Sequence, residues 1–323
     1  MCNKEINDVQ PTCLSHLIGN RGVTNQVKVA MDAAFEDNHR FPHAVMVGPP
    51  GMGKSTLASV ISKEMAVPFH EVLGQNLRNT GDLNSLLLQV EDKAIIHIDE
   101  VHEAPTAIQT ALYMALDKRQ IMVRGGSTIT ALPINDFTLL LSTTEEHDIL
   151  QPLRDRMRLT LRFDFYTELD LFQVVATRAK GLGWDIDDVI PSLIASRGRG
   201  APRIALKLLQ AARRCCRAAG ESLITAAHLR QACELESIDS FGLGFIEQKY
   251  LSLLVDGPRR VNVIASALGI PAKTLTSVQE PTLIRLGLID KDDVSRRYLT
   301  SKGREHLFRT IADESTDGSD FGF

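Results

Sequence analysis

Short apolar runs in the first half of the chain predict buried strands. They cover 44–47, 94–100 and 137–142, and the second run ends in an acidic pair. Continuous apolar segments of this length, bounded by turn residues, are typical of strands with both faces covered. Between the second and third run, 120–132 alternates apolar and polar residues around Gly125–Gly126, which predicts a β-hairpin. From about residue 241 the pattern changes to short amphipathic helices.

The first run leads into the sequence VGPPGMGKST at 47–56. This segment fits the phosphate-binding pattern G-x-x-x-x-G-K-[ST] with Gly48, Gly51, Gly53, Lys54 and Ser55. The strand at 44–47 and a helix predicted over 56–65 supply the setting that the pattern requires. Backbone N–H groups of the loop and the helix N-terminus would face the phosphates. Lys54 would reach the β- and γ-phosphates, and Ser55 would bind Mg²⁺. The chain is therefore predicted to bind a nucleotide.

The second run, AIIHIDE at 94–100, ends in Asp99 and Glu100. An acidic pair at the end of a strand beside a phosphate loop suits metal-assisted hydrolysis. Asp99 would hold Mg²⁺ through its water shell, and Glu100 would polarise the attacking water. His97 points away from the side taken by its two isoleucine neighbours, so we interpret it as a core or interface histidine.

Polar residues after the third run add candidates. Thr143 or Thr144 can hydrogen-bond the γ-phosphate or the water, although threonines at strand ends are common. The segment QPLRDRMR at 151–158 is rich in arginine and is either a solvated helix face or the source of an arginine for a neighbouring subunit's γ-phosphate. Arg203 opens a later helix and either reaches back to the nucleotide or is an ordinary exposed arginine.

Composition narrows the class of protein. The 323 residues are 44% hydrophobic, which suffices for cores in two or three domains. No run approaches the roughly 20 apolar residues of a membrane span, and the N-terminal residues lack the apolar segment of a secretion signal. The cysteines show no C-x-x-C spacing, which argues against a zinc site or a disulfide framework. We expect a cytoplasmic protein without membrane contact. The net charge of −4 means that any nucleic-acid binding uses local patches.

The C-terminal pattern predicts a winged helix. Two short helices, a turn at Gly269–Pro271 and a third helix make a helix-turn-helix, with Pro281 beginning or kinking a helix. Leu288–Ile289 and 295–300 are predicted as the two strands of the wing. Positive charge for the DNA backbone comes from Lys273, Arg285, Lys291, Arg296 and Arg297. The alternative is a winged helix that contacts only protein, because Asp290, Asp292 and Asp293 dilute the patch. The acidic segment 312–323 is predicted to be disordered.

Together these segments resemble the AAA+ ATPases and, among them, the RuvB family of bacterial Holliday-junction branch-migration motors. The resemblance runs from about Leu17 to about Phe308. The segments that carry it are HLIGN (16–20), VGPPGMGKSTLA (47–58), IHIDEVH (96–102), FTLLLSTT (137–144), PLRDR (152–156), FDFY (163–166), RGAPRIA (199–205) and GLGFIEQKYL (242–251). The implied fold is α/β: a P-loop NTPase large domain (1–164), a helical lid (165–238), a winged helix (239–311) and the acidic tail.

The resemblance also implies roles for individual residues. Nucleotide and Mg²⁺ would be bound by Ile18, Gly48, Gly51, Met52, Gly53, Lys54, Ser55, Thr56 and Tyr166, with Ser55 and Asp99 at the metal. Asp99 and Glu100 would catalyse hydrolysis, with a sensor at Thr143 or Thr144 and a lid sensor at Arg203. Arg156 would be the trans-acting arginine, with Arg154 as the alternative. DNA would be contacted by Lys273, Lys291, Arg296 and Arg297. The implied assembly is a ring, with six subunits as the favoured number.

Some segments depart from the family pattern. Glu145–Glu146 stands where the family commonly has an arginine, Met157–Arg158 replaces Phe-Gly, and ALDKRQ (115–120) replaces a more acidic and aromatic stretch. The hairpin at 120–132, which in the family docks onto the junction-binding partner RuvA, also differs. The leading hypothesis is an ATP-driven DNA translocase of the RuvB type. The alternatives are an ATP-switched, clamp-loader-like or scaffold protein whose winged helix binds protein, and an ATP-gated transcription regulator.

Overall fold

The computed structural model describes residues 5–125 and 128–308. The chain divides into two compact units. Unit 1 comprises residues 1–185 and 200–207, and unit 2 comprises 186–199 and 208–323. The predicted hairpin tip at Gly126 and the predicted disordered tail lie outside the described residues.

Unit 1 is built on a parallel sheet of five strands in the order β2-β3-β6-β1-β7. The strands are β1 (Ala44–Val47), β2 (Phe69–Leu73), β3 (Ile95–Asp99), β6 (Thr138–Thr143) and β7 (Leu159–Arg162). The strands predicted at 44–47, 94–100 and 137–142 are confirmed, with shifts of a residue at some ends. Since all five strands run in the same direction, their carboxyl ends meet at one edge of the sheet.

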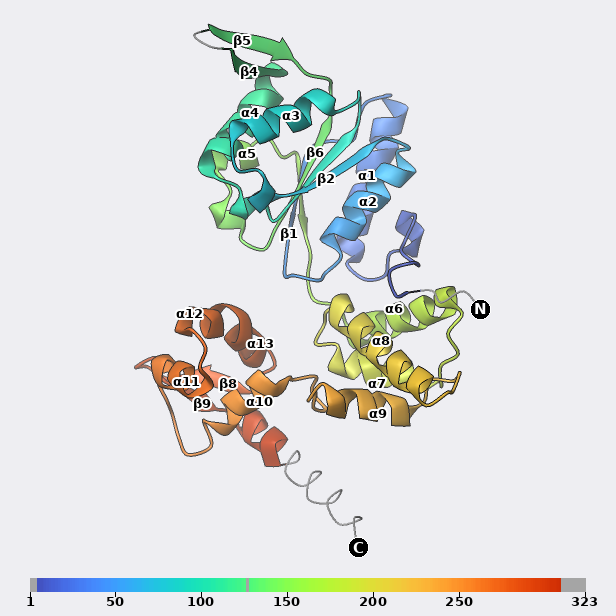
Figure 1. Cartoon of the computed structure of the whole chain (residues 1–323), viewed down its shortest axis with the longest axis vertical. Helices are drawn as coiled ribbons and strands as arrows, with labels where there is room; N and C mark the ends of the chain where they lie inside the picture. The colour runs from blue at the N-terminus through green and yellow to red at the C-terminus, as the bar shows by residue number, and fades with distance from the viewer. Residues whose placement is uncertain (1–4, 126–127, 309–323) are drawn as a thin grey trace, which may run out of the picture. The chain divides into compact units, whose positions relative to one another are not determined.

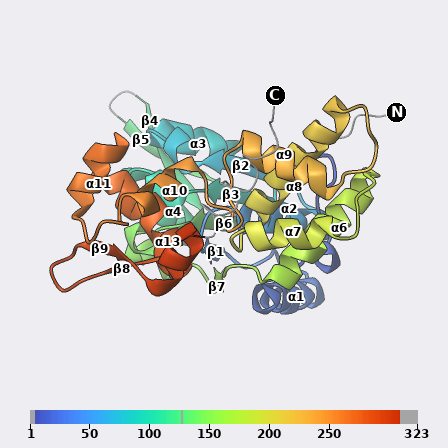
Figure 2. The ribbon, with the colours of Figure 1, turned by 90° about the horizontal axis from the view of Figure 1, so that it is seen from below.

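Alternation along the buried strands gives the sheet two apolar faces. On β3, Ile96 and Ile98 belong to one core cluster, whereas Ile95 belongs to the other. Helices α3 (Thr80–Gln89) and α4 (Thr106–Lys118) cover the first face, and α1 (Arg21–Glu36) and α2 (Lys54–Glu64) cover the second. Figures 1 and 2 show these helix pairs on opposite sides of the strands. The odd-numbered side chains of β3, including His97 and Asp99, therefore share the α2 face.

The start of α2 corrects one prediction. The helix begins at Lys54, two residues before the predicted Thr56. Gly53 precedes it with φ 92°, a left-handed conformation that glycine adopts without strain, so the helix can begin directly after the loop. The lysine and serine of the phosphate-binding pattern thus lie in the first helical turn.

Unit 1 also contains a hairpin and two further helices. The predicted hairpin is confirmed as β4 (Gln120–Gly125) paired antiparallel with β5 (Thr128–Pro133). It follows α4 directly, and Figure 1 shows it projecting beyond the sheet. The short α5 (Gln151–Arg154) covers the first half of the arginine-rich segment 151–158, and Arg156 and Arg158 follow it. Helix α6 (Glu168–Leu182) begins in a capping box formed by Thr167 and Asp170.

Unit 2 begins with helices. They are α7 (Ile190–Arg197), the larger part of α8 (Pro202–Ala218) and α9 (Ala226–Leu235). The first residues of α8, through Lys207, belong to unit 1. Arg203 therefore lies on the part of α8 that packs with the phosphate-binding loop.

The predicted winged helix is confirmed. It consists of α10 (Phe245–Ser252), α11 (Val261–Leu268), a third helix over 272–285, and the antiparallel strands β8 (Ile289–Lys291) and β9 (Arg297–Leu299). The third helix is divided into α12 (Ala272–Thr274), one π-helical segment (Leu275–Gln279) and α13 (Glu280–Arg285). Pro281 stands in the first turn of α13, as predicted, because it has no N–H to donate to the preceding turn.

Among residues 5–125 and 128–308, no single helix is long and apolar enough to cross a bilayer. One bent pair, α11 with 272–285, reaches that length and composition only when its two parts are joined.

Candidate active site

Three glycines shape the loop at the end of β1. Gly48 (φ 156°) approaches Phe163 so closely that a Cβ would lie 2.6 Å from its carbonyl oxygen. Gly51 (φ 80°) and Gly53 (φ 92°) both take left-handed backbone angles. Side chains at these positions would be strained or would clash. The loop can therefore keep its backbone N–H groups turned toward a bound phosphate, as the sequence pattern predicts.

Lys54 is held inside this loop. Its side chain is almost fully buried, and Nζ donates to the carbonyl oxygens of Gly48 (2.7 Å) and Pro49 (3.1 Å). Burial lowers the pKa of Lys54, Glu100 and Asp99 oppose that shift, and Arg203 adds to it. Its hydrogen-bond partners are neutral carbonyls, so a bound phosphate would be the first anion that it contacts directly.

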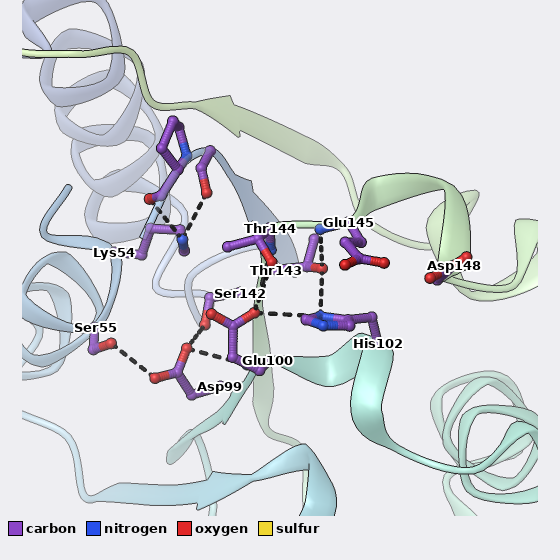
Figure 3. Close-up of polar contacts among 12 residues, drawn as sticks. Lys54, Ser55, Asp99, Glu100, His102, Ser142, Thr143, Thr144, Glu145 and Asp148 are labelled. Atoms are coloured by element: carbon purple, nitrogen blue, oxygen red, sulfur yellow. Dashed lines mark hydrogen bonds and ion pairs between the residues drawn. The ribbon is translucent and has the colours of Figure 1, made fainter. Parts of the chain in front are cut away.

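Ser55 and Asp99 provide the oxygen ligands expected for Mg²⁺. The Ser55 hydroxyl donates to Asp99 Oδ2 at 3.2 Å, and Ser142 donates to Asp99 Oδ1 at 2.5 Å (Figure 3). Burial alone would raise the pKa of Asp99, but the hydrogen bond from Ser142, the charge of His97 and the bond from Ser55 outweigh it and lower the pKa. An ionised carboxylate beside a hydroxyl fits a hard divalent cation.

Glu100 stands directly after β3 in a constrained conformation. Its backbone is left-handed (φ 48°, ψ 54°), which costs a non-glycine residue about 1–3 kcal/mol. Its carbonyl oxygen packs against Gly74, where a Cβ would come within 2.4 Å. Its carboxylate accepts from the Thr144 N–H (3.2 Å) and hydroxyl (3.4 Å) and lies 3.2 Å from His102 Nδ1 (Figure 3).

The two threonines at the end of β6 have different surroundings. Thr143 is fully buried, and its hydroxyl accepts from the Glu145 N–H (2.9 Å) and bonds His102 Nδ1 (3.0 Å). Thr144 is half-buried and binds Glu100 directly. Thr144 is thus the threonine in contact with the predicted general base.

An aromatic residue closes the other side of the loop. The Tyr166 hydroxyl donates to the Met52 carbonyl oxygen at 3.3 Å, and its ring would lie 2.6 Å from a Cβ on Gly19. Ile18 is half-buried next to that glycine. These residues come from three distant parts of the sequence, and the fold brings them to the phosphate-binding loop. Thr56, also half-buried, follows Ser55 in the first turn of α2.

The two predicted arginines lie in different places. Arg203 packs on the loop, since a Cβ on Gly51 would be 3.1 Å from its Cβ. Arg156 instead binds Asp117 on α4 through both Nε (2.7 Å) and Nη2, with its guanidinium 4.9 Å from the centre of the Tyr113 ring. The alternative, Arg154, is tied to Gln151.

The wing corrects one DNA-contact prediction. Arg297 is buried, and its guanidinium binds both carboxylate oxygens of Glu280 (2.8 and 3.1 Å). Its charge is used inside the domain because Glu280 is itself buried, so it does not present the surface charge that was expected. Lys291 also pairs with Glu280 (3.2 Å), and Arg296 pairs with Asp292 (2.7 Å). Lys273 is exposed and forms no ion pair with any residue that the structure describes.

Family models match along nearly the whole chain. Residues 9–163 match the Holliday junction DNA helicase RuvB P-loop domain, 166–239 the RuvB AAA lid domain, and 240–308 the RuvB C-terminal winged helix domain. The chain belongs to the RuvB family. It is therefore an ATPase with an AAA+ P-loop domain, a lid and a winged helix, as its sequence predicts.

Individual relatives agree with this assignment. The chain is 34% identical over 307 residues to the Holliday junction branch migration complex subunit RuvB of Kosmotoga olearia, covering 93% of this chain and 90% of the relative. It is 32% identical to the same subunit of Neorickettsia sennetsu, covering 93% and 92%. The structure matches the Thermotoga maritima RuvB Holliday junction branch migration motor with a TM-score of 0.79 and 30% identity, covering 93% and 98%.

Sequence reasoning missed several residues that contact the RuvB-type site. The sequence predicts Ser142 only as the end of a strand, although its hydroxyl faces the acidic pair and donates to Asp99. His102 lies three positions after Asp99, where the short helix at Val101–Glu103 turns it back toward Glu100. Asp117, the partner of Arg156, falls in the segment 115–120 that departs from the family. Strand alternation could have identified Ser142, but Asp117 and Arg156 are 39 residues apart and carry no such signal.

Proposed function

We propose that this chain is the ATP-driven motor subunit of a Holliday-junction branch-migration complex and works as a ring on branched DNA. The observation that carries the proposal is the arrangement of charges at the edge of the sheet where the carboxyl ends of the strands meet the phosphate-binding loop, called the phosphate edge below. Lys54, Ser55, Asp99 and Glu100 converge there with Thr144 beside the acid, and Arg203 packs on the same loop. The family membership adds a winged helix for DNA.

Each residue has a role in hydrolysis under this proposal. Lys54 binds the β- and γ-phosphates through an ammonium whose hydrogen bonds go to neutral carbonyl oxygens. Ser55 and Asp99 hold Mg²⁺, which when bound neutralises phosphate charge. Glu100 orients and deprotonates the attacking water. Thr144 senses the γ-phosphate through its bond to Glu100, because a shift of the threonine releases the carboxylate.

The ring is proposed from the position of Arg156. This arginine is held by Asp117 and Tyr113 rather than by the phosphate loop of its own chain. We propose that it serves the γ-phosphate of the neighbouring subunit, while Arg203 serves its own. We propose a hexameric ring with ATP between subunits, the assembly that the family resemblance implies. We also propose the boundaries 1–164, 165–238 and 239–311 for the three domains.

DNA and partner contacts complete the proposal. Lys273 supplies exposed charge on the third helix of the winged helix, with Lys291 and Arg296 in supporting positions. The β4–β5 hairpin is proposed to dock onto a RuvA-type junction-binding protein. Its described exposed residue Met122 offers an apolar contact for that purpose. We place the complex in the cytoplasm.

A second candidate is favoured by one observation. Lys291, Arg296 and Arg297 are all paired with acidic residues of the same domain. A winged helix with so much of its charge compensated would suit a scaffold or clamp-loader-like protein that binds protein partners. This alternative predicts slow ATP turnover that DNA does not stimulate.

One experiment separates the two candidates. A labelled synthetic four-way junction is incubated with the protein, ATP and a RuvA-type partner, and both branch movement and ATP hydrolysis are measured. The motor moves the branch and hydrolyses ATP faster with DNA. Retention of an unmoved junction with unstimulated hydrolysis would favour the scaffold.

Mixing variants tests the shared site. Lys54→Ala and Arg156→Ala should each be inactive alone. Mixed rings, however, contain interfaces in which an intact loop meets an intact arginine, so mixing should restore part of the activity. If mixing restores nothing and Arg156→Ala alone keeps normal hydrolysis, the trans role of Arg156 is wrong.

A further inference from the structure

A line of polar side chains runs across the α2 face of the sheet and ends at Asp99. Glu71 on β2, His97 on β3 and Ser142 on β6 belong to neighbouring strands. His97 Nδ1 lies 3.0 Å from Glu71 Oε1, and Nε2 lies 2.9 Å from Ser142 Oγ. Ser142 then bonds Asp99, and Asp99 bonds Ser55 (Figure 3 shows these last two contacts).

Because this line of side chains is buried, its polar groups need hydrogen-bond partners within the protein. His97 and Ser142 have no exposed surface, and His97 stacks on Phe69 with ring centroids 6.1 Å apart. A buried polar group without a partner costs about 1–3 kcal/mol. Each group on the line therefore needs its hydrogen-bond partner, which limits how the protons can be arranged.

The Ser142 hydroxyl has one proton, and it donates this proton to the Asp99 carboxylate. Asp99 Oδ1 can only accept when ionised, so the Ser142 hydroxyl must donate to it. The Ser142 oxygen is then left to accept, and the donor is His97 Nε2–H. A proton between His97 Nδ1 and Glu71 satisfies the other end.

These bonds also set the rotation of the Asp99 carboxylate. Oδ1 is occupied by Ser142 and by the Glu100 N–H at 3.1 Å. Oδ2 is left facing Ser55. Without a donor at position 97, the buried Ser142 oxygen loses one of its two partners, so the side chain is held from one side only and its bond to Oδ1 is no longer fixed.

We propose that His97 is a positioning residue for the Mg²⁺ site: by donating to Ser142, it commits the Ser142 proton to Asp99 and holds Oδ2 toward Ser55. The inference rests on the proposed metal role of Asp99 and Ser55. His97 itself touches neither nucleotide nor metal. Removing partners of this kind from metal-binding carboxylates and histidines typically weakens metal affinity about 10–100-fold.

The test measures nucleotide binding without hydrolysis. A fluorescent ATP analogue is titrated into the full-length protein in EDTA and then at increasing Mg²⁺. His97→Phe keeps the ring on Phe69 but removes both N–H groups. For His97→Phe we expect an unchanged nucleotide affinity in EDTA. The Mg²⁺ concentration that gives half of the Mg²⁺-dependent increase in affinity should rise about tenfold. His97→Gln, which retains a donor toward Ser142, should stay near wild type.

Matched variants locate the effect on the line of bonds. Ser142→Ala should behave like His97→Phe, and the double variant should be no worse than either because both break the same chain. Glu71→Ala, at a half-exposed position, should give a smaller shift in the same direction and carries little folding risk. His70→Phe is the control, because His70 also pairs with a glutamate but lies at the neighbouring position of β2, on the other face.

The outcomes are distinguishable. Equal losses in EDTA and in Mg²⁺ for His97→Phe would mean a merely structural role and would overturn the inference, as would a normal Mg²⁺ dependence of both His97→Phe and Glu71→Ala. Asp99→Asn separates this from the proposed function. If that variant shifts the Mg²⁺ dependence while the His97 variants do not, only the inference fails. If Asp99→Asn has no effect either, the metal assignment itself is wrong.

Discussion

The phosphate edge of unit 1 and the wing of unit 2 both bury charged side chains, but they treat the charges differently. At the phosphate edge, Lys54 is bound by carbonyl oxygens and Asp99 by hydroxyl and N–H groups. In the wing, Glu280 is bound by Arg297, by Lys291 and by the Tyr250 hydroxyl at 3.0 Å. The first arrangement leaves charge for a ligand, whereas the second neutralises it internally.

This difference separates the proposed ligand-binding residues from residues that stabilise the fold. A charge solvated by neutral dipoles keeps its full attraction for an incoming ion of opposite sign. A buried ion pair is already compensated, and breaking it leaves an unpaired charge. Arg297 looked like a DNA contact because only its position in the wing was visible in the sequence, whereas its buried partner decides its role.

The largest expected effect is on catalysis at the phosphate edge. Glu100→Gln removes the proposed general base but keeps the shape of the side chain, so kcat should fall roughly 100- to 10,000-fold. ATP binding should remain, because Lys54 and Ser55 are untouched. Steady-state hydrolysis and fluorescent nucleotide titration measure the two quantities. Glu145→Gln, an exposed neighbour, is the control, and a similar loss there would contradict the role given to Glu100.

The next effect is on stability in the wing. Glu280→Gln leaves Arg297 and Lys291 without their buried counter-charge and should lower the free energy of unfolding of this domain by about 3–5 kcal/mol. Urea denaturation followed by circular dichroism measures it. Asp292→Asn breaks only the partly exposed pair with Arg296 and should cost much less, because solvent screens that pair. Equal costs for the two variants would remove the distinction between buried and exposed pairs.

The same residue predicts a dependence on pH. Burial alone would raise the pKa of Glu280, but the bonds from Arg297 and Tyr250 outweigh it and hold the pKa below its ordinary value. A group with a depressed folded pKa stabilises the protein above its unfolded pKa of about 4.3 and loses that contribution as the pH falls through the folded value. The stability difference between wild type and Glu280→Gln should therefore be full at pH 6 and shrink below about pH 4.3. A pH-independent difference would contradict this.

The smallest effects concern DNA affinity. Lys273→Ala removes an unpaired surface charge and should weaken junction binding while lowering the salt slope by about one. Arg297→Met should leave that slope unchanged in protein that remains folded. Asp292→Asn should strengthen binding about two- to fivefold, because it frees Arg296 from its partner. Fluorescence anisotropy at several salt concentrations measures all three, and a salt slope that falls as much for Arg297→Met as for Lys273→Ala would contradict the comparison.

Predictions of structure from the sequence succeeded where short, contiguous segments carry the signal. The strand, loop and helix around 47–56 and the strand that ends at Asp99 needed only their own residues. The hairpin and the winged helix were likewise visible in local periodicity. Predictions were incomplete where a residue's role depends on a distant partner, as with Arg297 and Glu280 or Arg156 and Asp117, because sequence spacing does not reveal which side chains meet.

The sequence by itself determined the phosphate-binding loop, the acidic pair and the winged helix of this RuvB-family ATPase, since glycine conformation, strand alternation and helix periodicity are local properties. Only the tertiary structure decided which charged side chains remain available to a ligand and which are paired inside the protein. Parallel strand pairing places Glu71, His97, Ser142 and Asp99 on one face of the sheet, and the fold of the wing buries Glu280 against Arg297. Availability depends on neighbours brought together by packing, because an electrostatic interaction is governed by distance and burial and not by order along the chain.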